Sequence, residues 1–245
     1  MDCMVNKVAT IIQARMGSSR LPGKIMKRIG KKELLWYSAN RASKAKLVND
    51  TIIATTVDSR DNTVFDWCKT NGFPVFRGSE KDVLDRYYNC AKEFGANIIV
   101  RLTSDNPFCD PEIVDQLVLE LKKSKSDYVS NRVTKRTWPY GLDAEVFTFK
   151  ALKHAWEQAN KEHQREHVTP YILEHSEYFR LLEVPLDENL SNFRLSIDYP
   201  EDFEMCKVLI EGYNAHEMNW REIIDLLKKH PELVEINASR IDSKL

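Results

Sequence analysis

Apolar residues in the first half of the chain gather in short runs that alternate with amphipathic stretches. Short runs rich in β-branched residues are typical of buried parallel strands. Four such strands are predicted at residues 8–15, 51–57, 74–78 and 97–104. The intervening apolar positions recur at helical spacing and predict helices at about 33–46, at 59–71, and beginning at 79 and 111. This alternation predicts a doubly wound α/β sheet with right-handed crossovers.

The third predicted helix has the clearest pattern of the four. Ser79 is predicted as its N-cap, which places Asp82 in the first turn, where a carboxylate favours the positive end of the helix dipole. Apolar side chains at helical spacing from Val83 to Phe94 then form one stripe. The pattern therefore predicts a helix that packs one face against the sheet.

The second half of the chain has a different pattern, in which short strands and helices mix. Strands are predicted in the stretches "DYVSN", "DAEVFTF", "FRLLEVP" and "FRLSID", and helices near 150–162 and 163–175. Such a mixture predicts antiparallel strands added to a mostly parallel sheet. Because no internal repeat or Pro/Gly-rich linker interrupts the chain, we expect a single domain over 1–245, with a dimerisation or lid extension around 130–180.

Composition narrows the possible functions. With 42% apolar and 30% charged residues the chain is typical of a folded globular protein, and its net charge of −1 gives no sign of a nucleic-acid or membrane partner. The five cysteines form no C-x-x-C pair, which argues against a disulfide framework or a zinc site. No signal-peptide pattern or long apolar span is visible, so we expect a cytoplasmic protein.

The loop "ARMGSSRLPGK" after the first predicted strand carries three cations, Arg15, Arg20 and Lys24. It differs from a Walker A loop because its glycine spacing is longer and Lys24 is followed by isoleucine instead of Ser or Thr. Cations mixed with small residues at a strand end favour an anion-binding loop, and the alternative is a solvated surface turn.

Two other polar clusters follow predicted strands. The first comprises Arg77, Gly78, Ser79, Asp82 and Arg86, and the second Thr103, Ser104, Asp105 and Asn106. Ligands of open α/β sheets bind beyond the carboxyl ends of the strands, so these clusters are expected to meet the basic loop there. Cations and backbone donors gathered at one sheet edge suit a polyphosphate.

Two aspartates are candidate magnesium ligands. Asp105 follows a buried strand directly, and Asp198 ends the predicted strand "FRLSID" before a helix that begins with proline. Carboxylates together with substrate phosphates are the ligands that Mg²⁺ prefers. The structural alternatives are an Asx turn at Asp105 and a helix N-cap at Asp198.

The motifs "YGLDAEVF" and "QREHVTPYI" lie between the two aspartates in sequence. Asp143 and Glu145 stand two positions apart on a predicted strand, so both carboxylates are expected to point the same way. Arg165, Glu166 and His167 stand together before a proline. His167 is a candidate base or acceptor ligand, although a lone histidine is more often a structural residue.

Six of these stretches resemble, in order, the spore coat polysaccharide biosynthesis protein F family. They are "IIQARMGSSRLPGK", "GSEKDVLDRYY", "RLTSDNPFCDPEIVD", "YGLDAEVF", "REHVTPYI" and "LSIDYPEDFE". That family is similar to the cytidylyltransferases that make CMP-Kdo and CMP-sialic acid. The resemblance implies a nucleotidyltransferase with a three-layer α/β/α Rossmann-like fold. Ser104, Asn106 and the "DYP" stretch depart from the common pattern of this branch, which keeps both carboxylates but leaves the base and the acceptor open.

The resemblance also implies roles for individual residues. Nucleotide binding falls to Ala14, Arg15, Gly17, Ser18, Arg20, Lys24, Arg77, Ser79, Asp82, Arg86 and Thr103. Arg15, Lys24 and Asp105 are the candidate catalytic residues, and Asp105 and Asp198 the candidate Mg²⁺ ligands. Candidates for acceptor binding are Tyr140, Asp143, Glu145, Arg165, Glu166 and His167.

The working hypothesis is transfer of CMP from CTP, or of a nucleotide from another triphosphate, to an acidic sugar or phosphorylated acceptor with release of pyrophosphate. A homodimer is implied by analogy with sugar-acid cytidylyltransferases. One alternative is a nucleotide-sugar-dependent glycosyltransferase, although such enzymes typically carry a D-x-D motif and "SDNPF" offers a single aspartate. The other alternative is a non-catalytic nucleotide-binding module.

Overall fold

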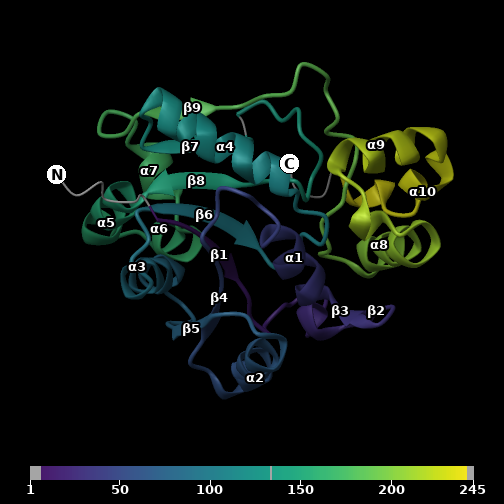
Figure 1. Cartoon of the computed structure of the whole chain (residues 1–245), viewed down its shortest axis with the longest axis horizontal. Coiled ribbons are helices and arrows are strands. Elements are labelled where there is room, and N and C mark those ends of the chain that lie inside the picture. The colour runs from purple at the N-terminus through teal and green to yellow at the C-terminus, as the bar shows by residue number, and fades with distance from the viewer. Residues whose placement is uncertain (1–6, 133, 242–245) are drawn as a thin grey trace.

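A seven-stranded sheet forms the centre of the computed structural model, which describes residues 7–132 and 134–241 (Figure 1). The strand order is β5-β4-β1-β6-β8-β7-β9. The bounds are β1 Val8–Gln13, β4 Asp50–Thr56, β5 Val75–Gly78, β6 Ile98–Thr103, β7 Tyr128–Ser130, β8 Glu145–Thr148 and β9 Leu181–Glu183. The short strands β2 (Arg28–Ile29) and β3 (Lys32–Glu33) pair separately.

The strand directions confirm the predicted mostly parallel sheet with antiparallel additions. β5, β4, β1 and β6 pair in parallel, and β8 then pairs antiparallel with both β6 and β7. The predicted strand at "FRLSID" is wrong, because within it only Arg194 bridges to another chain segment, at Tyr140. The extended chain there bonds irregularly instead, with Ile197 N donating to the carbonyl of Asp105 at 2.9 Å.

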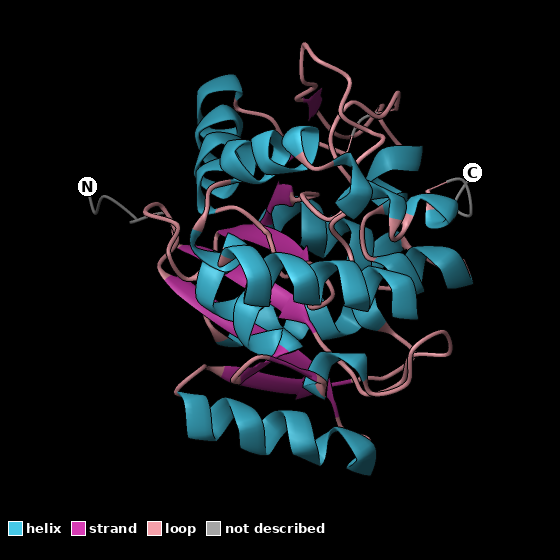
Figure 2. Ribbon diagram, turned by 90° about the vertical axis from the view of Figure 1, so that its right-hand side faces the viewer, coloured by secondary structure: helices cyan, strands magenta, loops and turns pink. Residues whose placement is uncertain are grey.

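The helices cover both faces of the strands (Figures 1 and 2). Their bounds are α1 Leu34–Ala42, α2 Asn62–Asn71, α3 Val83–Glu93, α4 Pro111–Ser124, α5 Phe149–Gln158, α6 Glu162–His167, α7 Pro170–Glu174, α8 Pro200–Tyr213, α9 Trp220–Lys229 and α10 Pro231–Glu235. Short 3₁₀ turns occupy Lys24–Met26, Ser59–Asp61, Ala215–Glu217 and Ala238–Arg240.

Two separate apolar clusters show the three-layer arrangement. Ile12 of β1 belongs to the cluster with α1, α4, α8 and α9, and its neighbour Ile11 belongs to the cluster with α3, α5 and α7. Successive side chains of a strand point to opposite faces of the sheet, so the two clusters lie on the two faces. The fold class is therefore the predicted α/β/α sandwich.

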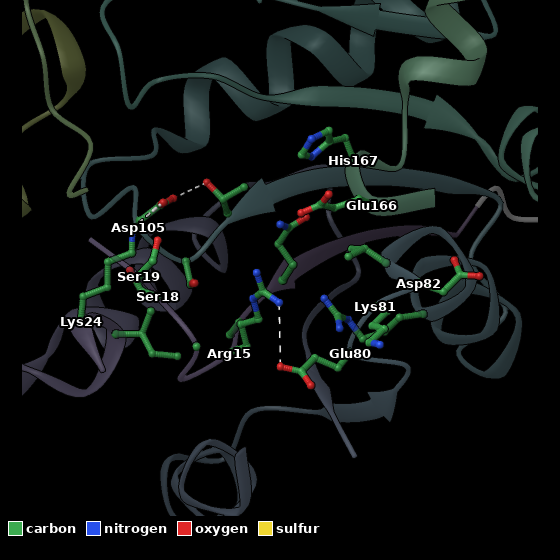
Figure 3. A pocket seen from close by; sticks show the side chains of 18 of the residues that line it. Arg15, Ser18, Ser19, Lys24, Glu80, Lys81, Asp82, Asp105, Glu166 and His167 are labelled. Carbon is green, nitrogen blue, oxygen red and sulfur yellow. Dashed lines mark hydrogen bonds and ion pairs between the residues drawn. The ribbon is translucent and has the colours of Figure 1, made fainter. Parts of the chain in front are cut away.

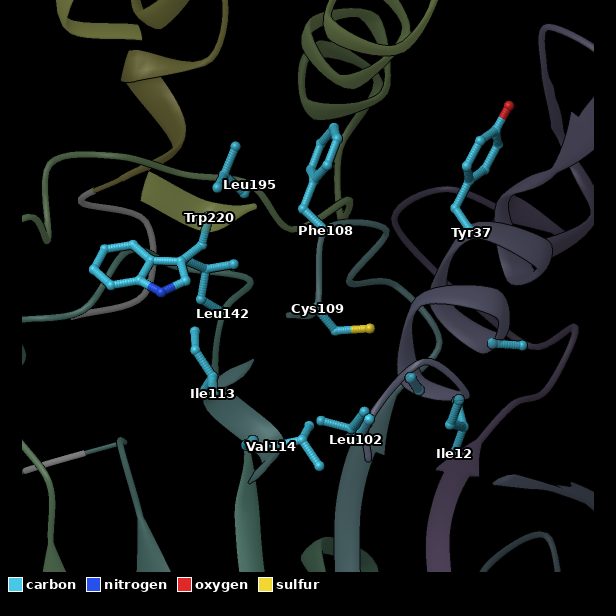
Figure 4. Packing of buried hydrophobic residues seen from close by; sticks show 14 of the residues in the cluster. Ile12, Tyr37, Leu102, Phe108, Cys109, Ile113, Val114, Leu142, Leu195 and Trp220 are labelled. Atoms are coloured by element: carbon cyan, nitrogen blue, oxygen red, sulfur yellow. The ribbon is translucent and has the colours of Figure 1, made fainter. Parts of the chain in front are cut away.

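The C-terminal helices share the first apolar cluster. Trp220 of α9 points toward the same apolar space as Ile113 of α4 and Leu142 (Figure 4). The Trp220 ring also packs on Trp138, with ring centroids 5.1 Å apart. Burial of these rings holds the C-terminal segment against the sheet layer.

Two predicted helix boundaries can be compared with the structure. The predicted end of the second helix at residue 71 is confirmed, and Gly72 adopts φ +75° at the C-cap of α2, a conformation that glycine tolerates. Ser79 is not the N-cap of α3, because that position is taken by Asp82, whose side chain accepts from Asp85 N at 2.8 Å. Ser79 Oγ accepts from Asp82 N at 3.0 Å and so closes the turn before the helix.

The described cysteines, Cys68, Cys90, Cys109 and Cys206, are free and buried. Burial raises the pKa of the Cys68 thiol to about 12. Cys3 lies outside the described residues. Within 7–132 and 134–241, no helix has the length and apolar character needed to span a bilayer.

Candidate active site

A cavity of about 760 Å³ opens beyond the carboxyl ends of β1 and β6 (Figure 3). Four parts of the chain line it, namely the loop after β1, the start of α3, the end of β6 and helix α6, together with Asp198. Fourteen of the predicted residues come together there: Ala14, Arg15, Gly17, Ser18, Arg20, Lys24, Asp82, Arg86, Thr103, Asp105, Arg165, Glu166, His167 and Asp198. The position agrees with the rule for ligand sites in open α/β sheets.

The basic loop after β1 is folded back on itself. Its Met16 N donates to the carboxylate of Asp61 at 2.7 Å, and Gly23 N donates to the carbonyl of Met16 at 3.2 Å. Gly23 adopts φ +65°, which L side chains rarely tolerate, and this turn leads directly into the 3₁₀ turn that begins at Lys24. The loop thereby directs Lys24 inward.

Lys24 connects the two candidate metal ligands. Its buried Nζ donates to Asp105 Oδ2 at 2.9 Å, to Asp198 Oδ1 at 3.1 Å and to the carbonyl of Ile197 at 2.6 Å. An ammonium has three protons, so all of its donors are used. One cation therefore lies among two carboxylate oxygens and one carbonyl oxygen.

Asp198 is embedded in a buried ionic network that sequence analysis did not predict. Arg194 Nη2 donates to Asp198 Oδ2 at 3.0 Å, and the same guanidinium bonds both carboxylate oxygens of Asp202. Burial alone would lower the pKa of Arg194, but the hydrogen bonds and negative charge of Asp202 and Asp198 raise it above its usual value. Asn237 Nδ2 donates to Asp202 Oδ1 at 3.0 Å. The C-terminal segment thus helps to fix Asp198.

Asp105 is held by its own strand end. Thr103 Oγ1 donates to Asp105 Oδ1 at 2.5 Å, and Asn106 Nδ2 donates to Thr103 Oγ1 at 3.1 Å. Since Ile197 N bonds the carbonyl of Asp105, the segments carrying the two aspartates are joined by backbone as well. This explains how residues 93 positions apart in the chain reach one ammonium.

The donor set fits a hard divalent cation of the kind that substrate phosphates also bind. Within 7–132 and 134–241, no three His, Cys, Asp or Glu side chains gather as a metal site. Mg²⁺, however, is usually held by one or two carboxylates plus phosphate oxygens. Asp105 and Asp198 already share a cation, Lys24, so their spacing suits that mode.

Two arginines differ in how they line the cavity. Arg15 is partly exposed, and its Nη1 lies 4.0 Å from Glu80 Oε1. Arg86 is buried, donates from Nη1 to the carbonyl of Ser79 at 2.6 Å, and its Nε has no hydrogen-bond partner among the described residues. Burial lowers the pKa of Arg86 from its usual value. A buried arginine with an unused donor is suited to bind an anion.

Helix α6 forms the opposite wall. Arg165 bonds the carboxylate of Asp82 through Nε and Nη2 and the carbonyl of Trp156 through Nη1, so it joins α6 to α3. Glu166 and His167 follow it on the cavity side (Figure 3). Neither side chain makes a hydrogen bond or ion pair with the described part of the chain. They are therefore available to a ligand.

A strained turn follows His167. Val168 has φ +72° and ψ −57°, and Thr169 N donates to the carbonyl of His167 at 2.9 Å, which together define a γ-turn of the rare type. A β-branched residue in this conformation stores strain, and such residues concentrate at functional sites. The turn leaves His167 at the boundary of a second cavity of about 650 Å³, lined also by Arg101, Arg132 and Thr134.

Five predicted residues do not line the first cavity: Arg77, Ser79, Tyr140, Asp143 and Glu145. Arg77 is committed to the end of β4, where Nε donates to the carbonyl of Thr56 at 2.8 Å. Tyr140 bridges to Arg194, and its ring lies under the guanidinium of Arg136 at 4.1 Å. Both therefore have structural contacts away from the cavity.

The prediction that Asp143 and Glu145 share a strand face is wrong, because β8 begins at Glu145. Asp143 lies before the strand and forms an ion pair with Arg136 at 2.9 Å. Glu145 is buried against Arg101, Tyr128 and Thr169. Burial alone would raise its pKa, but the charge of Arg101 and the hydrogen bonds lower the pKa of this carboxyl below its usual value.

The sequence pattern of the family described as cytidylyltransferase matches residues 9–229. The spore coat polysaccharide biosynthesis protein SpsF of Bacillus subtilis is 35% identical over 238 residues, covering 93% of this chain and 97% of that protein. A cytidylyltransferase structure from Leptospira borgpetersenii aligns with a TM-score of 0.88 at 36% identity, covering 93% of this chain and 96% of that one.

A more distant structure shares the fold. CMP:2-keto-3-deoxy-manno-octonic acid synthetase, solved in complex with CTP, aligns with a TM-score of 0.64 at 18% identity, covering 84% of this chain and 99% of that one. The match of the family pattern spans most of the chain, and the SpsF relative spans nearly all of it. The chain belongs to the cytidylyltransferase family.

Proposed function

We propose that this cytidylyltransferase binds CTP in the first cavity and transfers CMP to an acidic sugar or a phosphorylated acceptor. The observation that carries the proposal is the meeting of Asp105 and Asp198 on one ammonium, beside the basic loop and the buried Arg86. Cations around a polyphosphate and oxygen ligands for a divalent ion are the two requirements of nucleotidyl transfer.

The basic loop is proposed to hold the triphosphate. Arg15, Arg20 and Lys24 line the cavity with the small residues Gly17 and Ser18, which allow the backbone to approach the phosphates closely. Asp105 and Asp198 would hold Mg²⁺, which supplies charge neutralisation on the phosphate oxygens and the leaving pyrophosphate. Arg86, which lines the cavity, is proposed to add positive charge beside the nucleotide.

In the proposed reaction an oxygen of the acceptor attacks the α-phosphorus of the triphosphate. A new oxygen–phosphorus bond forms, the bond to pyrophosphate breaks, and the acceptor oxygen gives up its proton. The protein contributes by holding both substrates in line and by stabilising the charge that develops on the phosphates. No covalent intermediate with the protein is needed.

The acceptor is proposed to bind on the side of α6. Arg165, Glu166 and His167 line the first cavity there, and His167 with Arg132 lines the second. The guanidinium of Arg132 makes no hydrogen bond or ion pair with the described residues and can attract a carboxylate or phosphate. Glu145 is proposed to act indirectly, by orienting Arg101 and Thr169 beneath the second cavity.

The setting of the reaction follows from the SpsF relative, whose name places that protein in spore coat polysaccharide biosynthesis. We propose a comparable role for this enzyme in making surface polysaccharide or glycoconjugate, using CTP from the cytoplasm. We also propose a homodimer whose interface involves residues 130–180, where the side chains of Leu173 and Tyr178 are exposed. Sedimentation velocity of the wild-type protein tests the dimer.

The reaction is tested by pyrophosphate release. We expect purified enzyme with Mg²⁺ and a panel of acidic and phosphorylated sugars to release pyrophosphate from CTP in preference to ATP, GTP or UTP. Asp105→Asn should lower this activity by about a hundredfold or more, because it removes a charged ligand of the Mg²⁺ that would stabilise the transition state. Asp66→Asn, on the exposed face of α2, is the matched control and should keep full activity.

Two outcomes would contradict the proposal. Equal activity of Asp105→Asn and wild type would refute the metal assignment. Release of a free nucleoside diphosphate from a nucleotide sugar, without pyrophosphate release from CTP, would instead identify the glycosyltransferase alternative.

A further inference from the structure

The position of Lys24 raises a question about the order in which the site is filled. Its ammonium donates all three protons to oxygens, two from Asp105 and Asp198 and one from the backbone of Ile197. Asp105 Oδ2 and Asp198 Oδ1 are the same carboxylates that the proposed function assigns to a divalent cation. A lysine ammonium and a metal ion cannot occupy one position among the same oxygens.

The local charge adds to this competition. Asp198 also accepts from Arg20 at 2.8 Å and from Arg194 at 3.0 Å, so three cations already surround the two carboxylates. With Asp202, which also binds Arg194, the cluster holds three cations and three carboxylates among the described residues, so a divalent ion would add two positive charges to a balanced and partly buried group. The cluster therefore disfavours binding of a divalent cation as long as Lys24 stays between the carboxylates.

Within the described part of the chain, Lys24 differs from the other two cations because it alone bonds both Asp105 and Asp198. Arg194 is buried and fixed by both oxygens of Asp202, and Arg20 lies at the exposed rim of Asp198, against the ring of Tyr199 at 5.1 Å. Lys24 contacts both carboxylates from a short turn that lines the cavity, and its flexible stem can redirect the ammonium. A triphosphate in the cavity offers it a new anionic partner.

We infer that Lys24 is a gate on the metal site. It keeps Asp105 and Asp198 closed in the free enzyme, and it moves to the triphosphate when the nucleotide binds, which opens the carboxylates. The inference rests on the proposed function, because it assumes that the nucleotide and the metal use this cavity. Its consequence is an order of binding in which a divalent cation binds tightly only with or after the nucleotide.

The test uses Mn²⁺ as the probe and the free protein without nucleotide. Lys24→Met removes the competing charge and leaves a flexible side chain of similar length. This variant should bind Mn²⁺ at least about tenfold more tightly than wild type. Isothermal titration calorimetry or the loss of free Mn²⁺ signal in electron paramagnetic resonance measures the affinity. Lys81→Met is the matched control, since Lys81 lines the same cavity without contacting either carboxylate.

Two further measurements locate the effect. The double variant Lys24→Met with Asp105→Asn should lose the gain, because one of the two ligands is gone. Addition of CTP should tighten Mn²⁺ binding to wild type much more than to Lys24→Met, in which no gate is left to open. Circular dichroism and thermal melting of each variant establish that it is folded.

The inference is overturned if folded Lys24→Met binds Mn²⁺ as weakly as wild type or more weakly. It is also overturned if Lys81→Met shows the same gain, since the effect would then be one of general charge. Failure of CTP to bind would reject the proposed function, whereas the comparison of nucleotide-free proteins would still decide whether Lys24 competes with a cation.

Discussion

On one side of the cavity the charged groups are bonded to one another, whereas on the other side they face the space where a ligand would sit. Lys24 bonds both Asp105 and Asp198 near the loop after β1. Glu166 and His167, at the end of α6, have no side-chain partner in the described part of the chain. The two carboxylates are thereby held in place before a ligand binds, and in the inferred gate only the Lys24 side chain moves on binding.

This difference suggests what each side does for a family of related enzymes. A triphosphate is the same in every reaction of this kind, so a rigid side with fixed carboxylates can serve all of them. Acceptors differ, and an open side whose residues are not committed can change without disturbing the fold. Substitutions at three positions test this contrast between the two sides, and each is expected to have an effect of a different size.

The largest effect on stability is expected from Arg194→Met, which removes a buried cation that helps to hold Asp198 on the rigid side. Arg194 is fully buried and bonds Asp198 and Asp202, so its removal leaves the buried carboxylate of Asp202 without its cation and takes one of three cations from Asp198. Breaking a buried ion pair in this way costs about 3–5 kcal/mol. We expect the free energy of unfolding, measured by urea denaturation, to fall by an amount in this range.

Two controls separate this effect from a general loss of stability. Arg221→Met removes an exposed cation that pairs with Glu112 and should change the unfolding free energy by less than about 1 kcal/mol. A double variant, Arg194→Met with Asp202→Asn, removes the carboxylate that has lost its cation and should recover part of the loss. An Arg194→Met protein as stable as wild type would show that the network does not stabilise the segment of Asp198.

The next largest effect is expected from substitution of Gly141, which packs against the backbone of the segment that leads to Asp198. Gly141 has φ +96°, and a Cβ added there would lie 2.5 Å from backbone atoms of Leu195 and Ser196. Gly141→Ala should destabilise the protein by about 2–4 kcal/mol, because backbone strain and a clash with backbone add together. The Tyr140–Arg194 bridge lies beside it, so the segment leading to Asp198 must shift.

The affinity of the variant for CTP is then compared with that of wild type at a temperature where both are folded. We expect Gly141→Ala to weaken CTP binding, because Asp198 moves with its segment. Gly72→Ala is the control: it also has a positive φ, +75°, but nothing lies within 4 Å of an added Cβ. It should lower stability without affecting CTP binding, and a weakening equal to that of Gly141→Ala would contradict the explanation.

The first half of the fold and the position of the two aspartates were predictable from local patterns. Short apolar strands followed by amphipathic helices indicate a doubly wound sheet, and the ligand rule then places the strand ends at one edge. Asp198 was expected at a strand end and instead lies in an irregular segment, yet Ile197 bonds the carbonyl of Asp105 and brings it to the same place.

Other features depend on contacts that no local pattern reports. The bonds that Arg194 makes with Asp202, and that Asn237 makes with Asp202, join segments whose approach is decided by tertiary packing. The error at Ser79 has a local cause, since Ser79 and Asp82 are both good caps and the turn between them takes the first. Glu145 was misjudged because a buried carboxylate is recognised only when its partner, Arg101, is known from strand pairing.

The smallest effect is expected on the open side, from His167→Gln. His167 lies between the two cavities and has no side-chain partner among the described residues, so its replacement should leave the fold and CTP affinity unchanged. Loss of one hydrogen bond to the acceptor should raise the KM for that substrate about tenfold. His230→Gln is the matched control, because His230 bonds Glu232 and lines neither cavity. If His167→Gln weakened CTP binding as much as acceptor binding, the nucleotide side and the acceptor side of the cavity would not be separate. The contrast between a rigid donor side and an open acceptor side would then fail.

If only the KM for the acceptor rises, residues at the end of α6 select the acceptor. Exchange of Glu166 and His167 between relatives then becomes a direct way to change which acceptor is used.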